Sequence, residues 1–67
     1  MKVGDWVKME DADDPRSIPA YRDMRGRIEE LRDNGAMKVA WFDRLYGHGI
    51  GRDEFPRDPA TVVKVAS

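Results

Sequence analysis

The pair Asn34-Gly35 restricts the fold of this chain more than any other feature, because it separates two segments with strand character. A two-residue type I′ turn requires positive φ at both central positions, and Asn-Gly adopts that conformation at low cost. Each flanking segment is long enough to form one strand of a hairpin. We therefore predict a β-hairpin over residues 25–42, with Asn34-Gly35 in a type I′ turn.

The segment after the turn has the side-chain pattern of a half-buried strand. Every second residue is expected to face the core, and this row consists of Met37, Val39 and Trp41. The intervening row, Lys38, Ala40 and Phe42, is expected on the opposite face, because successive side chains of a strand alternate. The partner strand before the turn is predicted over residues 26–31.

An amphipathic helix near residues 19–33 is an alternative to that partner strand. Tyr21, Met24, Ile28 and Leu31 follow one another at spacings of 3, 4 and 3 residues, which would place them on one helix face. Against the helix, Gly26 would lie at its centre, where glycine costs about 1 kcal/mol relative to alanine. A strand makes the fold all-β, whereas a helix would make it α+β.

The amino-terminal segment also alternates, and we predict a strand over residues 5–9. Val3, Val7 and Met9 are expected on the core side, with Trp6 on the outer side. Trp41 shares a row with other core residues. We therefore expect Trp41 to be buried and Trp6 to be partly exposed.

A long loop is expected over residues 10–21, which show no apolar periodicity. Pro15 and Pro19 restrict φ there and disfavour a helix. Ile18 and Tyr21 are the side chains expected to anchor this loop on the rest of the domain.

The carboxyl-terminal part of the chain predicts two more strands and a tight turn. One strand begins at Ile50, and the β-branched segment 61–65 forms the last one. Pro56 and Pro59 lie close together before that last strand, which favours one turn of 3₁₀ helix. The sequence thus predicts five strands in all.

Composition narrows the class of protein. The 67 residues are expected to form one domain, residues 1–67, without disulfides because the chain has no cysteine. With His48 as the only histidine, neither a metal site nor a cofactor site is expected.

No apolar run approaches the roughly 20 residues of a membrane span, so we expect a cytoplasmic protein without a membrane partner. The net charge of −1 argues against strong nonspecific binding to nucleic acid.

Several motifs resemble those of small SH3-like barrels. Residues 3–7, VGDWV, resemble the GDxV entry strand of these domains, and residues 25–28, RGRI, resemble their G-x-(V/I) strand. Residues 52–55, RDEF, resemble the DEL close of the ferredoxin-facing small barrels found in photosystem I and in the variable chain of ferredoxin–thioredoxin reductase. Residues 19–21, PAY, together with 25–28 are similar to a run in the barrel of the nitrile hydratase β chain, with two extra residues between the tyrosine and the arginine. The resemblance implies a five-stranded SH3-like barrel with a long first loop and a single 3₁₀ turn before the last strand.

An interaction surface is the function that the residues favour. Arginine outnumbers lysine by eight to four, and a guanidinium group suits carboxylates, phosphates and aromatic faces. The candidate binding residues, beside whichever tryptophan faces outward, are Tyr21, Arg22, Arg25, Arg44, Tyr46, His48 and Arg52. We expect the first loop and the 43–51 loop to bring them together. The protein is then a non-catalytic module that docks to a protein partner or self-associates.

Other interpretations stay open at this stage. The arginines could form a nucleic-acid-binding surface, and the resemblance also allows an accessory component of a redox or hydratase enzyme. No catalytic residue and no small-molecule substrate are evident. The acidic residues of segment 10–14 could instead fold back and neutralise the arginines within the monomer.

Overall fold

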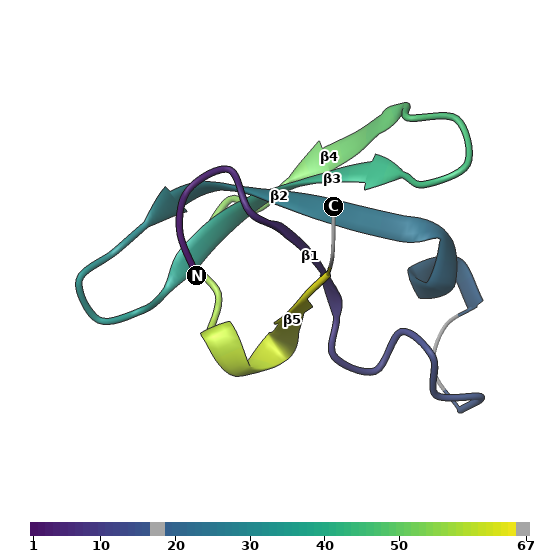
Figure 1. The fold of residues 1–67 in the computed structure, drawn as a ribbon, viewed down its shortest axis with the longest axis horizontal. Helices are drawn as coiled ribbons and strands as arrows, with labels where there is room; N and C mark the ends of the chain where they lie inside the picture. The colour runs from purple at the N-terminus through teal and green to yellow at the C-terminus, as the bar shows by residue number, and fades with distance from the viewer. Residues whose placement is uncertain (17–18, 66–67) are drawn as a thin grey trace.

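The computed structural model describes residues 1–16 and 19–65 and is all-β, as predicted. Its strands are β1 (Trp6–Met9), β2 (Met24–Leu31), β3 (Met37–Asp43), β4 (Gly49–Arg52) and β5 (Val62–Lys64). They form one antiparallel sheet in the order β4-β3-β2-β1-β5 (Figure 1). The sheet is open, because the edge strands β4 and β5 do not pair with each other in the described part of the chain. Two 3₁₀ helices accompany it, η1 (Pro19–Asp23) and η2 (Pro59–Thr61).

The predicted 3₁₀ turn before the last strand is confirmed as η2. Asp58 caps it, because its side chain accepts a hydrogen bond from the Ala60 N–H at 2.9 Å. The helix alternative for residues 19–33 is wrong. Only η1 is helical there, and it is a short 3₁₀ helix that sequence reasoning did not predict.

Gly26 allows β2 to pack closely against its neighbours. It lies opposite Val7 of β1 and Trp41 of β3 in the middle of the sheet. A Cβ atom at this position would lie 2.9 Å from Trp41 Cε3 and would overlap Val39 Cγ1. The same residue that disfavours a helix here therefore allows the Trp41 ring to lie close to the backbone of β2.

The turn between β2 and β3 differs from the predicted type I′ turn. The Arg32 N–H donates to the Ala36 carbonyl at 2.8 Å, and the Gly35 N–H donates to the Arg32 carbonyl at 2.9 Å. Of the described residues, only glycines have positive φ, so Asn34 does not adopt the conformation that type I′ requires, whereas Gly35 has φ +89°. This is a three-residue loop with a type I turn followed by a glycine bulge. Asn34 Oδ1 supports it by accepting from the Ala36 N–H at 3.0 Å.

Replacement of Gly35 by valine should lower the free energy of unfolding by more than about 1 kcal/mol, because a β-branched residue is strained at positive φ. Urea unfolding followed by circular dichroism measures the change. Gly49→Val is the matched control, since Gly49 lies in edge strand β4, has no positive φ and has open space around its Cα. An equal loss of stability in both variants would show that the backbone conformation of Gly35 is not the cause.

The core lies on one face of the sheet and contains the predicted row of β3. Its buried residues are Val7, Ile28, Met37, Val39, Trp41 and Val62, with Met9 and Met24 packed against them. Trp41 is only 6% exposed, whereas Trp6 is half-buried on the other face. The predicted contrast between the two tryptophans is therefore confirmed.

One residue predicted to face the core does not do so in the structure. Val3 is exposed rather than in the core, because residues 2–5 form a turn in which the Asp5 N–H donates to the Lys2 carbonyl. In the first loop, Ala12 is buried, and its N–H donates to the Met9 carbonyl. Tyr21 is half-buried, and Ile18 lies outside the described residues.

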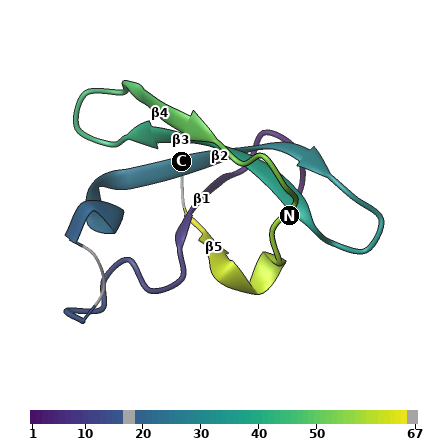
Figure 2. The same cartoon turned by 180° about the vertical axis from the view of Figure 1, so that it is seen from behind.

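The loops gather at the two ends of the sheet. Figures 1 and 2 show the β2–β3 turn at one end, and the β3–β4 loop together with η1 at the other. The Arg44 N–H, just after β3, donates to the Asp23 carbonyl at the end of η1 at 2.6 Å. The end of the first loop, in η1, and the β3–β4 loop therefore lie at the same end of the sheet, as the sequence predicted.

Candidate functional site

The face of the sheet opposite the core carries aromatic and cationic side chains. Trp6 pairs with Arg27 across β1 and β2, and Arg25 pairs with Phe42 across β2 and β3. Directly paired residues of neighbouring strands point to the same face, as do residues two apart on one strand. These four side chains therefore share the outer face.

An open hollow of about 700 Å³ lies on this face, at the end where the two loops meet. Four segments line it: β1, the start of β2, the end of β3 with the loop that follows, and the residue after β5. The lining residues are Trp6, Arg25, Phe42, Asp43, Arg44, Gly47 and Val65. Its surface is mostly apolar, with charged groups at a few points, as is typical of a binding site.

Two aromatic rings form the apolar part of the hollow. The ring centroids of Trp6 and Phe42 are 5.7 Å apart, and the ring planes are inclined by 57°. Both side chains are half-buried, so part of each ring is accessible. Val65 completes this part, and its N–H extends the ladder by donating to the Trp6 carbonyl at 3.0 Å.

Arg25 is held in place by the backbone around it. Its Nη1 donates to the Arg22 carbonyl at 3.1 Å and to the Met24 carbonyl at 2.9 Å. A guanidinium group has five N–H donors, so donors remain for a ligand. Because these contacts already restrict the side chain, binding would immobilise it at little further entropic cost.

The β3–β4 loop is closed by its own hydrogen bonds. The Asp43 N–H donates to the His48 carbonyl at 2.8 Å, and the Gly47 N–H donates back to the Asp43 carbonyl at 2.7 Å. Asp43 Oδ1 also accepts from the Leu45 N–H at 2.8 Å. Gly47 has φ +74°, a conformation that glycine adopts without strain. These bonds position Arg44 at the rim of the hollow.

The structure brings together some of the predicted binding residues. Arg25 and Arg44 line the hollow. Tyr46 and His48 lie on the adjoining loop with ring centroids 6.2 Å apart. Tyr21 and Arg22 belong to η1, which is bonded to that loop through the Asp23 carbonyl and is therefore near the hollow without lining it.

Arg52 lies away from this group. It pairs with Ala40 across β3 and β4, and its Nε is 3.2 Å from Glu29 Oε1. Phe42 and Val65 are the lining residues that sequence reasoning did not select. The alternation that placed Trp41 in the core indicated that Phe42 faces outward, but no local pattern indicated Val65.

The acidic first loop contributes one carboxylate near the hollow. The hydrogen bond from the Lys8 ammonium group to Asp13, at 2.6 Å, lowers the pKa of the Asp13 carboxyl below its ordinary value. The positive charges of Arg25 and Arg22 lower that pKa further, so Asp13 lies within their electrostatic reach. The acidic loop therefore partly offsets the positive charge around the hollow.

Comparisons with known proteins do not identify a relative. No protein-family model, curated protein or solved structure matches this chain. Within residues 1–16 and 19–65, no helix combines the length and the apolar character needed to cross a membrane. Histidine and carboxylate side chains of this described part do not gather in groups of three that could hold a metal ion.

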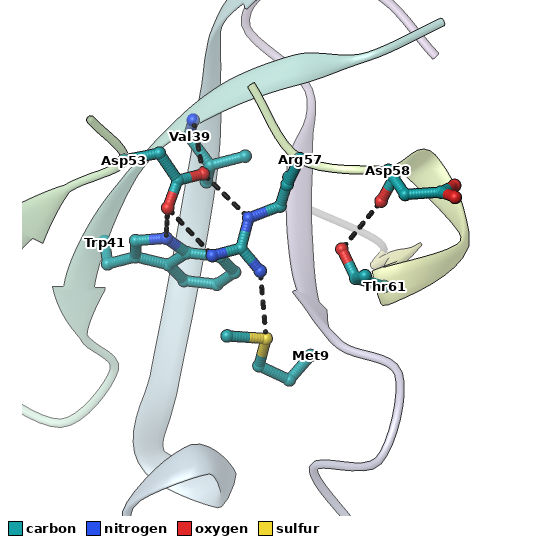
Figure 3. A network of polar contacts seen from close by, with 7 residues as sticks. All are labelled: Met9, Val39, Trp41, Asp53, Arg57, Asp58 and Thr61. Atoms are coloured by element: carbon teal, nitrogen blue, oxygen red, sulfur yellow. Dashed lines mark hydrogen bonds and ion pairs between the residues drawn. The ribbon is translucent and has the colours of Figure 1, made fainter. Parts of the chain in front are cut away.

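A second polar cluster lies beside the core, around the partly buried side chain of Asp53 (Figure 3). Its Oδ1 accepts from Trp41 Nε1 at 3.1 Å and from Arg57 Nη2 at 2.8 Å. Its Oδ2 accepts from Arg57 Nε at 2.7 Å and from the Val39 N–H at 3.1 Å. Both carboxylate oxygens are thus fully bonded, which suits a structural role better than a ligand site.

The Arg57 guanidinium group also contacts Trp41 and Met9 in this cluster. Its Cζ lies 4.8 Å from the centroid of the Trp41 ring, and its Nη1 is 3.3 Å from Met9 Sδ. The backbone of Arg57 forms two hydrogen bonds with that of Met37, at 2.8 and 3.0 Å. Burial alone would raise the pKa of Asp53, but the hydrogen bonds from Arg57, Trp41 and Val39 outweigh it, and the pKa is lowered.

Proposed function

We propose that this chain is a non-catalytic interaction module that docks to a protein partner through the outer-face hollow. The observation that carries the proposal is the accessible pair of Trp6 and Phe42 beside the guanidinium groups of Arg25 and Arg44. Aromatic and arginine side chains are the residue types that contribute most to the energy of protein interfaces. The seven lining residues include no hydroxyl, thiol or imidazole group that could act as a nucleophile.

We further propose that the domain belongs to the SH3-like small barrels. The strand order β4-β3-β2-β1-β5, the long first loop and the 3₁₀ helix before the last strand support this assignment. The pairing of Arg57 with Met37 supports it as well, because it keeps the chain beside β3 up to η2, from which the chain reaches β5 at the opposite edge of the sheet. Domains of this shape serve many functions, so the fold does not select one.

Binding of single-stranded nucleic acid is the second candidate. Trp6 and Arg27 are direct neighbours across β1 and β2, and such aromatic and cationic neighbours can stack on bases and contact phosphates. The net charge of −1 provides no overall basic excess for binding phosphates, so it favours the protein partner instead. Self-association and a role as an accessory component of an enzyme are special cases of docking to a protein.

Nuclear magnetic resonance of the ¹⁵N-labelled protein tests the proposal through its two indole N–H signals. The probes are short capped peptides with a central phenylalanine flanked by glutamate, glutamine or lysine, and a single-stranded oligothymidylate. A docking peptide is expected to shift the Trp6 signal and to leave the Trp41 signal in place, because Trp41 Nε1 is bonded to Asp53 in the core.

Replacement of Phe42 by alanine should weaken this binding by roughly tenfold or more, because the peptide loses an aromatic contact. Phe55→Ala is the matched control, since Phe55 is exposed and does not line the hollow. Shifts confined to the β2–β3 turn, or equal weakening by both variants, would contradict docking in the hollow. Binding of the oligothymidylate alone, with a steep decrease as salt increases, would favour the second candidate.

A further inference from the structure

The cations of the outer face are not all equally available. Lys8 is paired with Asp13 at 2.6 Å, and Arg52 is paired with Glu29 at 3.2 Å. In contrast, neither Arg25 nor Arg44 has a carboxylate partner within 4.0 Å among the described residues. The two arginines that line the hollow are thus among the outer-face cations, Arg27 included, that no carboxylate of the described residues neutralises.

The one carboxylate in the lining does not change this balance. Asp43 Oδ1 accepts from the Leu45 N–H within the loop, so that atom already has a partner. Two guanidinium groups and one carboxylate line the hollow. The lining is therefore net positive, and a ligand with negative charge complements it.

The apolar and cationic parts of the hollow are contiguous. Arg25 is the direct cross-strand neighbour of Phe42, and Arg44 follows β3 two residues after Phe42. Trp6, whose ring is 5.7 Å from that of Phe42, carries the apolar surface on to Val65. A ligand that fits must present an apolar group and anionic groups close together.

We infer that the hollow binds a protein segment in which an aromatic or aliphatic side chain is flanked by carboxylates. The inference rests on the proposed docking function and specifies the chemistry of its partner. The apolar side chain lies against Trp6, Phe42 and Val65. The flanking carboxylates accept charge-assisted hydrogen bonds from Arg25 and Arg44, which are stronger than hydrogen bonds between neutral groups.

A comparison of two of the peptides described above tests this inference. The peptide with phenylalanine flanked by glutamate is expected to bind roughly tenfold or more tightly than the matched glutamine peptide, and the lysine peptide more weakly than both. Affinities come from titrations that follow the Trp6 indole signal. Arg44→Gln should abolish most of the preference for glutamate over glutamine, and Arg25→Gln should do the same.

Arg32→Gln is the matched control, because Arg32 lies in the β2–β3 turn at the opposite end of the sheet and should leave the preference unchanged. Arg44 is exposed, so its variant is expected to fold even if that of Arg25 does not. An unchanged Trp41 indole signal checks the fold of each variant.

The outcomes separate this inference from the proposed function. Equal binding of the glutamate and glutamine peptides at Trp6, or a preference that survives both arginine substitutions, would overturn the inference and leave docking intact. Tighter binding of oligothymidylate than of the glutamate peptide at the same residues would overturn it in favour of nucleic acid. The absence of any shift at Trp6 with every peptide would reject the docking function and the inference together.

Discussion

Replacement of Trp41 by alanine is expected to unfold the domain. Trp41 is almost fully buried, its ring lies against Gly26, and the Arg57 guanidinium group lies over it. Removing a buried aromatic side chain costs about 3–5 kcal/mol. At roughly 0.05–0.15 kcal/mol per residue, a chain of this length has about 3–10 kcal/mol of stability in total. The loss therefore amounts to all of this stability at the lower end of the range and to about a third to a half of it at the upper end.

Circular dichroism and urea unfolding measure this effect, and Trp6→Ala is its matched control. Because Trp6 is half-buried on the outer face, its replacement should cost about 1 kcal/mol and leave the domain folded. Trp41→Phe separates the contribution of aromatic packing from that of the hydrogen bond, because it keeps an aromatic ring and removes the indole N–H that donates to Asp53. A larger loss for Trp6→Ala than for Trp41→Ala, or easier quenching of Trp41 by acrylamide, would show that the two faces are assigned wrongly.

Replacement of Asp53 by asparagine is expected to cause the second largest loss, about 2–4 kcal/mol at neutral pH. The Asp53 side chain is only 10% exposed and that of Arg57 21%, so the guanidinium charge would lose its counter-ion in a largely dry environment. An amide group also presents N–H donors to a site that already supplies four donors. Asp33→Asn, in the exposed β2–β3 turn, is the control and should have the same free energy of unfolding as the original protein.

The pH dependence provides an independent measurement on the same carboxyl. The pKa of Asp53 is lower in the folded protein than its ordinary value of 3.8. The charged form therefore stabilises the fold above about pH 3.8, and this contribution is lost as the pH falls through the folded pKa. In Asp53→Asn, the free energy of unfolding should therefore decrease less between about pH 5 and pH 2 than it does in the original protein. A pH profile as steep as that of the original protein would contradict this contribution.

A double-mutant cycle tests whether Asp53 and Arg57 act as a pair. Asp53→Asn leaves the guanidinium group buried without a counter-ion, whereas adding Arg57→Met removes that charge and keeps an unbranched side chain over Trp41. The double variant should therefore lose less stability than the sum of the two single variants. Simple additivity would show that the two groups contribute independently.

The sequence by itself determined the features that depend on neighbouring residues. The alternation from Met37 to Trp41 set the core-facing row of β3, because side chains of a strand point to opposite faces in turn. Pro56 and Pro59 indicated one turn of 3₁₀ helix before the last strand, because closely spaced prolines that restrict φ favour a tight turn. The presence of a hairpin at Asn34-Gly35 was also predictable. Its turn type was not, because the Asn34 side chain bonds the Ala36 N–H and favours a longer loop.

Only the tertiary structure decided which residues form the hollow. Its lining comes from four separate segments, and the strand registers align them: Arg25 meets Phe42 across β2 and β3, and Trp6 meets Arg27 across β1 and β2. Val65 joins them because β5, the last strand of the sequence, pairs with β1, the first strand. Register and strand order depend on packing between residues distant in sequence, such as Trp41 against Gly26, and no local pattern encodes such contacts. The chain's residue types thus predicted an arginine-rich and aromatic surface, whereas long-range packing selected its members.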